Sequence, residues 1–148
     1  MEDYKYSELT GKIIGCAMKV HRVIGPGFPE IIYMRCLMIE LKKSGLNFET
    51  EVERDIFYEG IKVGSRRLDL IVDNKVIVEL KAVTEVEPLF YNQIINYLKI
   101  FKIEIGLLIN FENISCNTDV LQTPDDEVID QRNQINQINQ RLKSAFHV

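Results

Sequence analysis

The spacing of apolar residues in the first third of the chain predicts two helices. Over residues 9–24 apolar side chains recur every three or four positions, which is typical of an amphipathic helix packed on a core. This spacing defines a stripe formed by Ile13, Ala17, Val20 and Ile24. A Gly-Pro-Gly break at 25–27 precedes a second helical pattern, which begins at Pro29 and runs to Ser44 before Gly45 ends it.

The middle of the chain changes to a strand pattern. Runs rich in β-branched and aromatic residues are separated by the turn residues Gly60 and Asn74. The predicted strands cover residues 51–58, 61–73 and 75–81. A helical pattern at 87–101 and an apolar run at 104–110 follow. This order predicts an α/β domain in which a three-stranded meander is followed by a helix and a returning strand.

Charged residues cluster at the end of the third predicted strand. Successive side chains of a strand point to opposite faces, so Glu79 and Lys81 share a face with Ile77, and the other face of the run is wholly apolar. A solvated strand would more usually spread its charges along the exposed face. A carboxylate and an amine side by side after an apolar residue are typical of the edge of a cleft.

Whether Asp69 joins this pair depends on the turn before the third strand. In an antiparallel hairpin, Asp69 lies opposite Glu79 if a three-residue loop is centred on Asn74, with positive φ expected at Asn74 or Lys75. A two-residue Asp-Asn turn would instead set Asp69 against the residue before Glu79, on the wrong face. Both Asn and Asp are common in turns, so the sequence allows either geometry.

Several motifs, in order along the chain, resemble those of a known family. The spacing from Asp69 to residues 79–81 (ELK) is similar to that of the PD-(D/E)XK nuclease superfamily. Residues 27–33 (GFPEIIY) match the motif that names its GxxExxY subgroup. The resemblance covers roughly residues 8–112 and continues through segments 78–83, 93–98 and 106–111.

The resemblance implies a fold and a domain organisation. The fold would be an α/β, restriction-endonuclease-like αβββαβ core, with a mixed central sheet flanked by helices. The nuclease-like domain would span residues 1–117, and 118–148 would form a polar, Gln/Asn-rich tail that is helical or disordered. Apolar heptad positions in the tail allow a helix that packs on the domain or on a second subunit of a homodimer, with disorder as the alternative.

The implied activity is phosphodiester hydrolysis by a Mg²⁺- or Mn²⁺-dependent nuclease, with DNA favoured over RNA. Magnesium prefers oxygen ligands and binds through one or two carboxylates plus waters and substrate phosphate. Asp69 and Glu79 would be these carboxylates, and the resemblance adds the Leu80 carbonyl as a third ligand. Lys81 would orient the attacking water or help to deprotonate it.

Three further residues have both a functional and a structural interpretation. Glu30 lies on the apolar stripe of the second predicted helix, where it can serve the site or simply complement the helix dipole. Gln93 can be a site residue or a core amide satisfied by backbone. Arg67, two positions before Asp69, can contact substrate phosphate or mark a solvated strand end. The family pattern favours catalytic roles for Glu30 and Gln93.

Composition neither requires nor excludes a nucleic-acid partner. The 148 residues are 46% hydrophobic, which suits one domain with its own core. The net charge of −4 lacks the basic excess typical of nucleic-acid-binding proteins. Residues 1–110 nevertheless hold 15 Lys and Arg against 16 Asp and Glu, so the acidic excess lies mostly in the tail. The competing interpretation is a non-catalytic interaction module on the same fold, part of a defence or regulatory complex.

Cysteine spacing and hydropathy indicate no other class of protein. The three cysteines show no CxxC spacing and no paired histidines, which argues against a zinc site or a disulfide framework. No apolar run approaches the ~18 residues that a membrane span needs. We therefore expect a cytoplasmic protein with no membrane partner.

Overall fold

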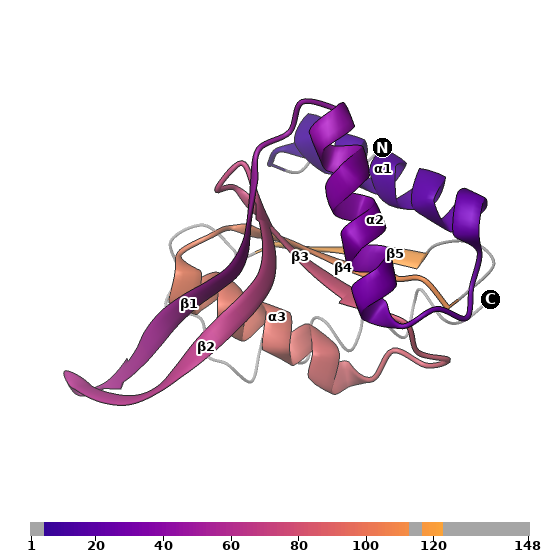
Figure 1. Ribbon diagram of the computed structural model, residues 1–148. Coiled ribbons are helices and arrows are strands. Elements are labelled where there is room, and N and C mark those ends of the chain that lie inside the picture. The colour runs from indigo at the N-terminus through magenta and orange to yellow at the C-terminus, as the bar shows by residue number, and fades with distance from the viewer. Residues whose placement is uncertain (1–4, 113–116, 123–148) are drawn as a thin grey trace.

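A five-stranded mixed sheet in the order β1-β2-β3-β4-β5 lies between helices in the computed structural model, which describes residues 5–112 and 117–122 (Figure 1). The predicted α/β class, with a mixed sheet flanked by helices, is confirmed. The elements are α1 (Ser7–Ile24), α2 (Glu30–Lys43), β1 (Phe48–Tyr58), β2 (Ile61–Val72), β3 (Val76–Lys81), α3 (Pro88–Phe101), β4 (Ile105–Asn110) and β5 (Asn117–Gln122).

Helices α1 and α2 cover one face of the sheet, and α3 covers the other (Figure 1). A hydrophobic cluster lies on each side of the sheet, and alternate residues of β3 contribute side chains to each cluster. Val76, Val78 and Leu80 join the cluster beneath α1 and α2, whereas Ile77 joins the cluster beneath α3. Both faces of β3 are therefore buried, as the nearly continuous apolar run of this strand requires.

The sheet is mixed because β3 and β4, which α3 connects, run parallel while the other neighbouring strands run antiparallel. Strands β1, β2 and β3 pair antiparallel, β3 and β4 pair parallel through the α3 crossover, and β5 pairs antiparallel with β4. The sequence had predicted the last strand at 104–110, but the sheet continues through β5. The Asn-Thr-Asp-Val-Leu-Gln segment lacks the alternation that identifies a strand, which explains why it was missed. The rest of the predicted tail, with its heptad stripe, lies outside the described residues.

The long β1–β2 hairpin changes face part-way along its length. Near the sheet, Phe48 and Leu70 pack under α1 and α2, but Val52 and Leu68 pack with the α3 cluster although their numbering has the same parity. Between them Glu51 adopts φ 55°, a left-handed conformation that is uncommon for a non-glycine residue. The outer half of the hairpin therefore turns toward the α3 side.

Gly106→Ala is expected to destabilise the protein by about 1–3 kcal/mol. A Cβ at Gly106 would lie 2.6 Å from Cγ2 of Ile94, a fully buried residue of α3, so α3 would have to move away from β4. The control is Gly15→Ala in α1, where nothing lies within 4 Å and loss of backbone freedom should instead stabilise by about 0.5–1 kcal/mol. Urea denaturation of both variants measures the difference, and equal midpoints would contradict the packing argument.

Candidate active site

The β2–β3 register decides the question that the turn left open. The pairs Leu70–Val78, Ile71–Ile77 and Val72–Val76 define a three-residue loop, so the same register continued by one position sets Asp69 opposite Glu79. Positive φ at Asn74 (54°) confirms the prediction for that residue. Lys75 does not share it, and the second left-handed residue is Asp73 (51°).

Strands β2 and β3 separate at the point where these two acids lie. Their ladder ends at Leu70 and Val78, whereas β3 stays paired with β4 as far as Lys81 and Asn110. Asp69 and Glu79 are the first residues beyond the separation, so their side chains lie where the sheet opens.

The carboxyl end of β3 is held by the end of β4. The Asn110 side chain accepts the Val83 N–H (3.2 Å) and donates to the Val83 carbonyl (2.9 Å), and the Phe111 N–H donates to the Lys81 carbonyl (2.8 Å). The Lys81 ammonium lies 4.3 Å from the centre of the Phe90 ring on α3, a favourable cation–π geometry. These contacts define the position of the lysine before any ligand binds.

Glu79 is a buried acid with an unpartnered oxygen. Its side chain is only 8% exposed, and Oε2 has no hydrogen-bond partner among the described residues. Burial first, and then the nearby Asp69 and Glu30 carboxylates, together raise the pKa of Glu79 to about 7, although the Lys81 ammonium lowers it. Such a carboxylate is stabilised in its charged form by a bound cation.

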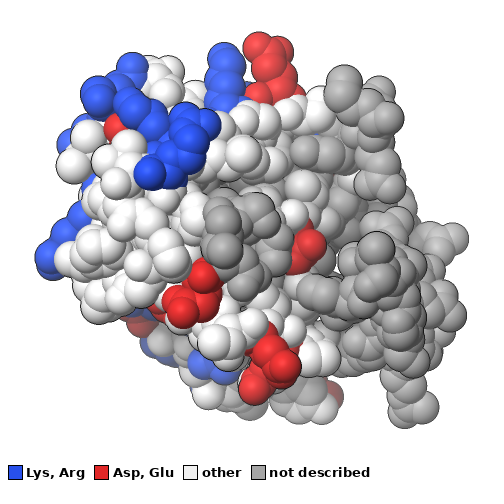
Figure 2. Space-filling view, turned by 90° about the vertical axis from the view of Figure 1, so that its right-hand side faces the viewer, with Lys and Arg blue, Asp and Glu red and all other residues white. Residues whose placement is uncertain are grey.

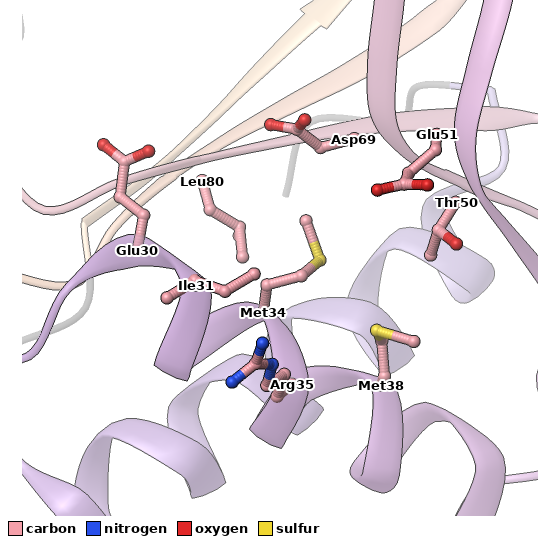
Figure 3. A pocket seen from close by; sticks show the side chains of 9 residues that line it. All are labelled: Glu30, Ile31, Met34, Arg35, Met38, Thr50, Glu51, Asp69 and Leu80. Atoms are coloured by element: carbon pink, nitrogen blue, oxygen red, sulfur yellow. The ribbon is translucent and has the colours of Figure 1, made fainter.

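A cleft of about 550 Å³ opens between the start of α2 and strands β1 to β3 (Figure 3). The carboxylates of Glu30 and Asp69 both extend along its upper side, with Leu80 between the two elements that carry them. Glu30 is the first residue of α2, and this position places it at the rim of the cleft. The lining residues are Glu30, Ile31, Met34, Arg35, Met38, Thr50, Glu51, Asp69 and Leu80.

Tyr33 holds the backbone that leads into α2. Its buried hydroxyl donates to the Gly25 carbonyl (2.7 Å) and accepts the Phe28 N–H (3.2 Å), and its ring stacks on Phe111 at 4.4 Å between centroids. Gly27, at φ 96°, adopts a conformation that other residues rarely reach. The segment before Glu30 and the segment that binds the Lys81 carbonyl are thus packed against each other.

A half-buried row of α3 residues borders the acids on the other side of the sheet. Phe90, Gln93 and Tyr97 follow one another at three- and four-residue spacing, so they share a helix face. Burial and the charges of Glu79 and Asp69 raise the pKa of Tyr97, which places its hydroxyl near both acids. Gln93 lies between Tyr97 and the Phe90 ring under Lys81, and its amide makes no hydrogen bond within the described segments.

The structure gives Arg67 a carboxylate partner and adds a further acid to the cleft. Arg67 forms an ion pair with Glu51, so its guanidinium already has a carboxylate partner. Glu51, which the sequence analysis did not single out, lines the same cleft as Asp69 and Glu30. The β1–β2 register sets it opposite Asp69, between the pairs Thr50–Leu70 and Val52–Leu68, and no local sequence signal predicts its left-handed backbone.

The family model of the PD-(D/E)XK nuclease superfamily matches residues 7–122, from the start of α1 to the end of β5. The chain belongs to the PD-(D/E)XK nuclease superfamily. In its fold, Asp69 and the Glu79-Leu80-Lys81 run lie where β2 and β3 separate. A search of curated protein sequences found no match.

Two solved structures align with this superfamily member at low sequence identity. The crystal structure of SSO0001 aligns with a TM-score of 0.52 and 23% identity, covering 76% of this chain and 57% of that chain. The chain thus spans little more than half of that protein. The crystal structure of an alkaline exonuclease (LHK-Exo) from Laribacter hongkongensis aligns with a TM-score of 0.49 and 9% identity, over 97% of this chain and 84% of that one.

Nucleases of the PD-(D/E)XK superfamily usually use divalent metal ions, and the donor set of this chain fits one. No group of three or more His, Cys, Asp or Glu side chains within residues 5–112 and 117–122 is arranged to hold a metal. Two carboxylates with a backbone oxygen and waters suffice for Mg²⁺ or Mn²⁺. The unpartnered Oε2 of Glu79 is a buried anion suited to such a cation. In the described part of the chain, no helix has the length and hydropathy to cross a membrane.

Proposed function

We propose that this protein is a nuclease that hydrolyses phosphodiester bonds of nucleic acid and depends on Mg²⁺ or Mn²⁺. The observation that carries the proposal is the buried, unpartnered carboxylate oxygen of Glu79, opposite Asp69 and two residues from Lys81. Structural residues seldom leave a buried acid oxygen without a partner. In a site that binds a cation, this oxygen would be a metal ligand.

The proposed roles follow from the positions of the side chains. Asp69, Glu79 and the Leu80 carbonyl would hold the metal, which when bound polarises the phosphate and lowers the pKa of water. Lys81 holds the attacking water and offsets negative charge on the phosphate. Glu30, at the rim of the cleft, and Gln93, on α3, would position waters on the two sides of the acids. DNA is the favoured substrate.

Lys81→Met should reduce turnover by about 10²-fold or more, which is the contribution typical of a positioned acid or base. Methionine keeps a long apolar stem on the Phe90 ring, so folding should be little affected. Lys75→Met is the matched control, because the Lys75 ammonium also lies over an aromatic ring, Tyr6 at 5.4 Å, but at the far end of β3. Single-turnover cleavage of a labelled oligonucleotide measures both. Equal loss in the two variants would argue against a role for Lys81 in the chemistry.

One assay decides between the proposed function and its alternative. Purified protein is incubated with plasmid, single-stranded DNA and RNA in the presence of Mg²⁺, Mn²⁺ or EDTA. We expect cleavage with a metal and none in EDTA. If no substrate is cleaved with either metal, the nuclease proposal fails and a non-catalytic interaction module, part of a defence or regulatory complex, replaces it.

We also propose that the chain belongs to the GxxExxY subgroup. The three named positions have distinct physical tasks here: Gly27 provides a left-handed backbone, Glu30 starts α2 at the cleft, and the Tyr33 hydroxyl ties the preceding loop together. The motif thus supports the placement of one acid at the site. This interpretation explains why the motif combines a fully buried residue, Tyr33, with an exposed one, Glu30, three positions earlier.

A further inference from the structure

Two arginines lie directly opposite each other on the outer half of the β1–β2 hairpin. Arg54 of β1 pairs with Arg66 of β2 in the strand register. Both have the parity of Val52 and Leu68, which pack in the cluster beneath α3. The arginine pair therefore lies on the face of the hairpin that turns toward α3, whereas Arg67 points to the opposite face.

Both arginines lie along the same row of α3 that borders the acids. The Arg54 guanidinium carbon is 5.5 Å from the centre of the Phe101 ring, one helical turn after Tyr97. The Arg66 charge lowers the pKa of Tyr97, against the larger effects of burial and Glu79, which places Arg66 near that hydroxyl. The row on α3 thus runs from the residue under Lys81, past the acids, to the arginine pair.

Neither arginine is neutralised by an ion pair within the described residues. Other cations of the same hairpin are neutralised by ion pairs: Arg67 pairs with Glu51, and Lys62 pairs with Asp55 (3.1 Å). Like charges directly opposite in a β-ladder destabilise it. A hairpin that keeps two exposed guanidinium groups side by side, without a carboxylate, is suited to an anion with several acceptor oxygens.

We propose that Arg54 and Arg66 bind a backbone phosphate of the same nucleic-acid strand that places a phosphodiester at Asp69 and Glu79, a few nucleotides away. This inference rests on the proposed nuclease function and names how the substrate is held. Arg66 is three residues from Asp69, or about 10 Å along the strand. That separation corresponds to about three steps of the axial rise of a duplex strand, or fewer for an extended single strand.

Several basic side chains elsewhere on the protein are less suited to this task, because they already form ion pairs. In Figure 2, Lys and Arg gather at the upper left, at the height of α1 and α2. In this helical layer, three lysines form ion pairs with glutamates on the same two helices: Lys12 with Glu8, and Lys19 and Lys43 with Glu40. The hairpin pair has no such partner and lies on the α3 side of the sheet, where Glu79 points.

Salt-dependent binding tests the phosphate contact without any cleavage. The probe is a fluorescently labelled single-stranded DNA, with an RNA of the same sequence as a second arm, titrated with full-length protein in EDTA over a series of KCl concentrations. Arg54→Gln and Arg66→Gln should each weaken binding several-fold at low salt. Each should lower the slope of log K against log salt by about 0.7, because one phosphate contact is lost.

Matched variants separate this role from a general charge effect. Arg67→Gln removes the neighbouring cation on the other face and should leave the slope unchanged. Arg66→Lys keeps a charge and should keep most of the slope. If Arg54→Gln unfolds because its contact with Phe101 is lost, Arg66→Gln alone carries the test.

The inference is overturned by an unchanged slope in Arg66→Gln, or by equal slope changes in Arg66→Gln and Arg67→Gln. Failure of the nuclease function is distinguishable, because wild-type protein would then bind the probe in EDTA with the arginine-dependent slope but cleave nothing with metal. Wild-type protein that binds neither probe overturns the phosphate contact directly. A difference between the DNA and RNA arms identifies the nucleic acid that is bound.

Discussion

Asp69→Asn is expected to abolish metal-dependent cleavage while the protein stays folded. Asp69 is exposed at the separation of β2 and β3, so its replacement by an isosteric amide removes a negative charge without disturbing the core. A neutral amide is a poorer ligand for Mg²⁺ or Mn²⁺ than a carboxylate, and Glu79 would be left as a single acid. Calorimetry should show weak metal binding to wild-type protein and none to the variant, and plasmid cleavage should fall below detection.

The matched control for this experiment is Asp73→Asn. Asp73 belongs to the turn after the same strand, and its left-handed backbone suits Asn well. This variant should bind metal and cleave as wild type does. Full activity of Asp69→Asn, with unchanged metal affinity, would remove Asp69 from the site.

Glu79→Gln should stabilise the metal-free protein at alkaline pH by about 3 kcal/mol. In the folded protein the pKa of Glu79 is about 7, above its value of about 4.5 in the unfolded chain. The folded state therefore holds this proton more tightly, and the stability that the neutral acid contributes is fully present below pH 4.5 and lost as the pH rises through 7. A glutamine stays neutral throughout, so the variant keeps this stability.

Urea denaturation of wild type and Glu79→Gln in EDTA, from pH 4.5 to 8, measures the effect. The two free energies of unfolding should agree at the acidic end and diverge as the pH rises, and Mg²⁺ or Mn²⁺ should raise the wild-type value only. Glu85→Gln, at an exposed loop carboxyl, controls for the loss of one charge. Parallel curves for wild type and Glu79→Gln would contradict the burial of an ionisable Glu79.

Much of the fold was predictable because its signals are local. Helical spacing placed α1, α2 and α3 close to their observed bounds, since each helix buries one stripe on the sheet. Alternation in β3 correctly separated Ile77 from Val76 and Val78, because the faces of a strand alternate wherever the strand is regular. The candidate acids followed from the same alternation and from the family motifs. Strand β5 was not predicted, because an edge strand with mostly polar residues lacks the alternation of apolar and polar residues that identifies a strand.

The tertiary structure decided what depends on pairing between distant segments. The sequence allowed two turn geometries before β3, and the pairing of β2 with β3 in the folded sheet has the register that sets Asp69 opposite Glu79. The change of face at Glu51 decided which arginines share the α3 side with the acids, so Arg67 turned to Glu51 while Arg54 and Arg66 turned to α3. The alternation of a strand sequence has a period of two, so it does not predict where a strand changes face. This change results from packing across the sheet, which brings together segments distant in the sequence.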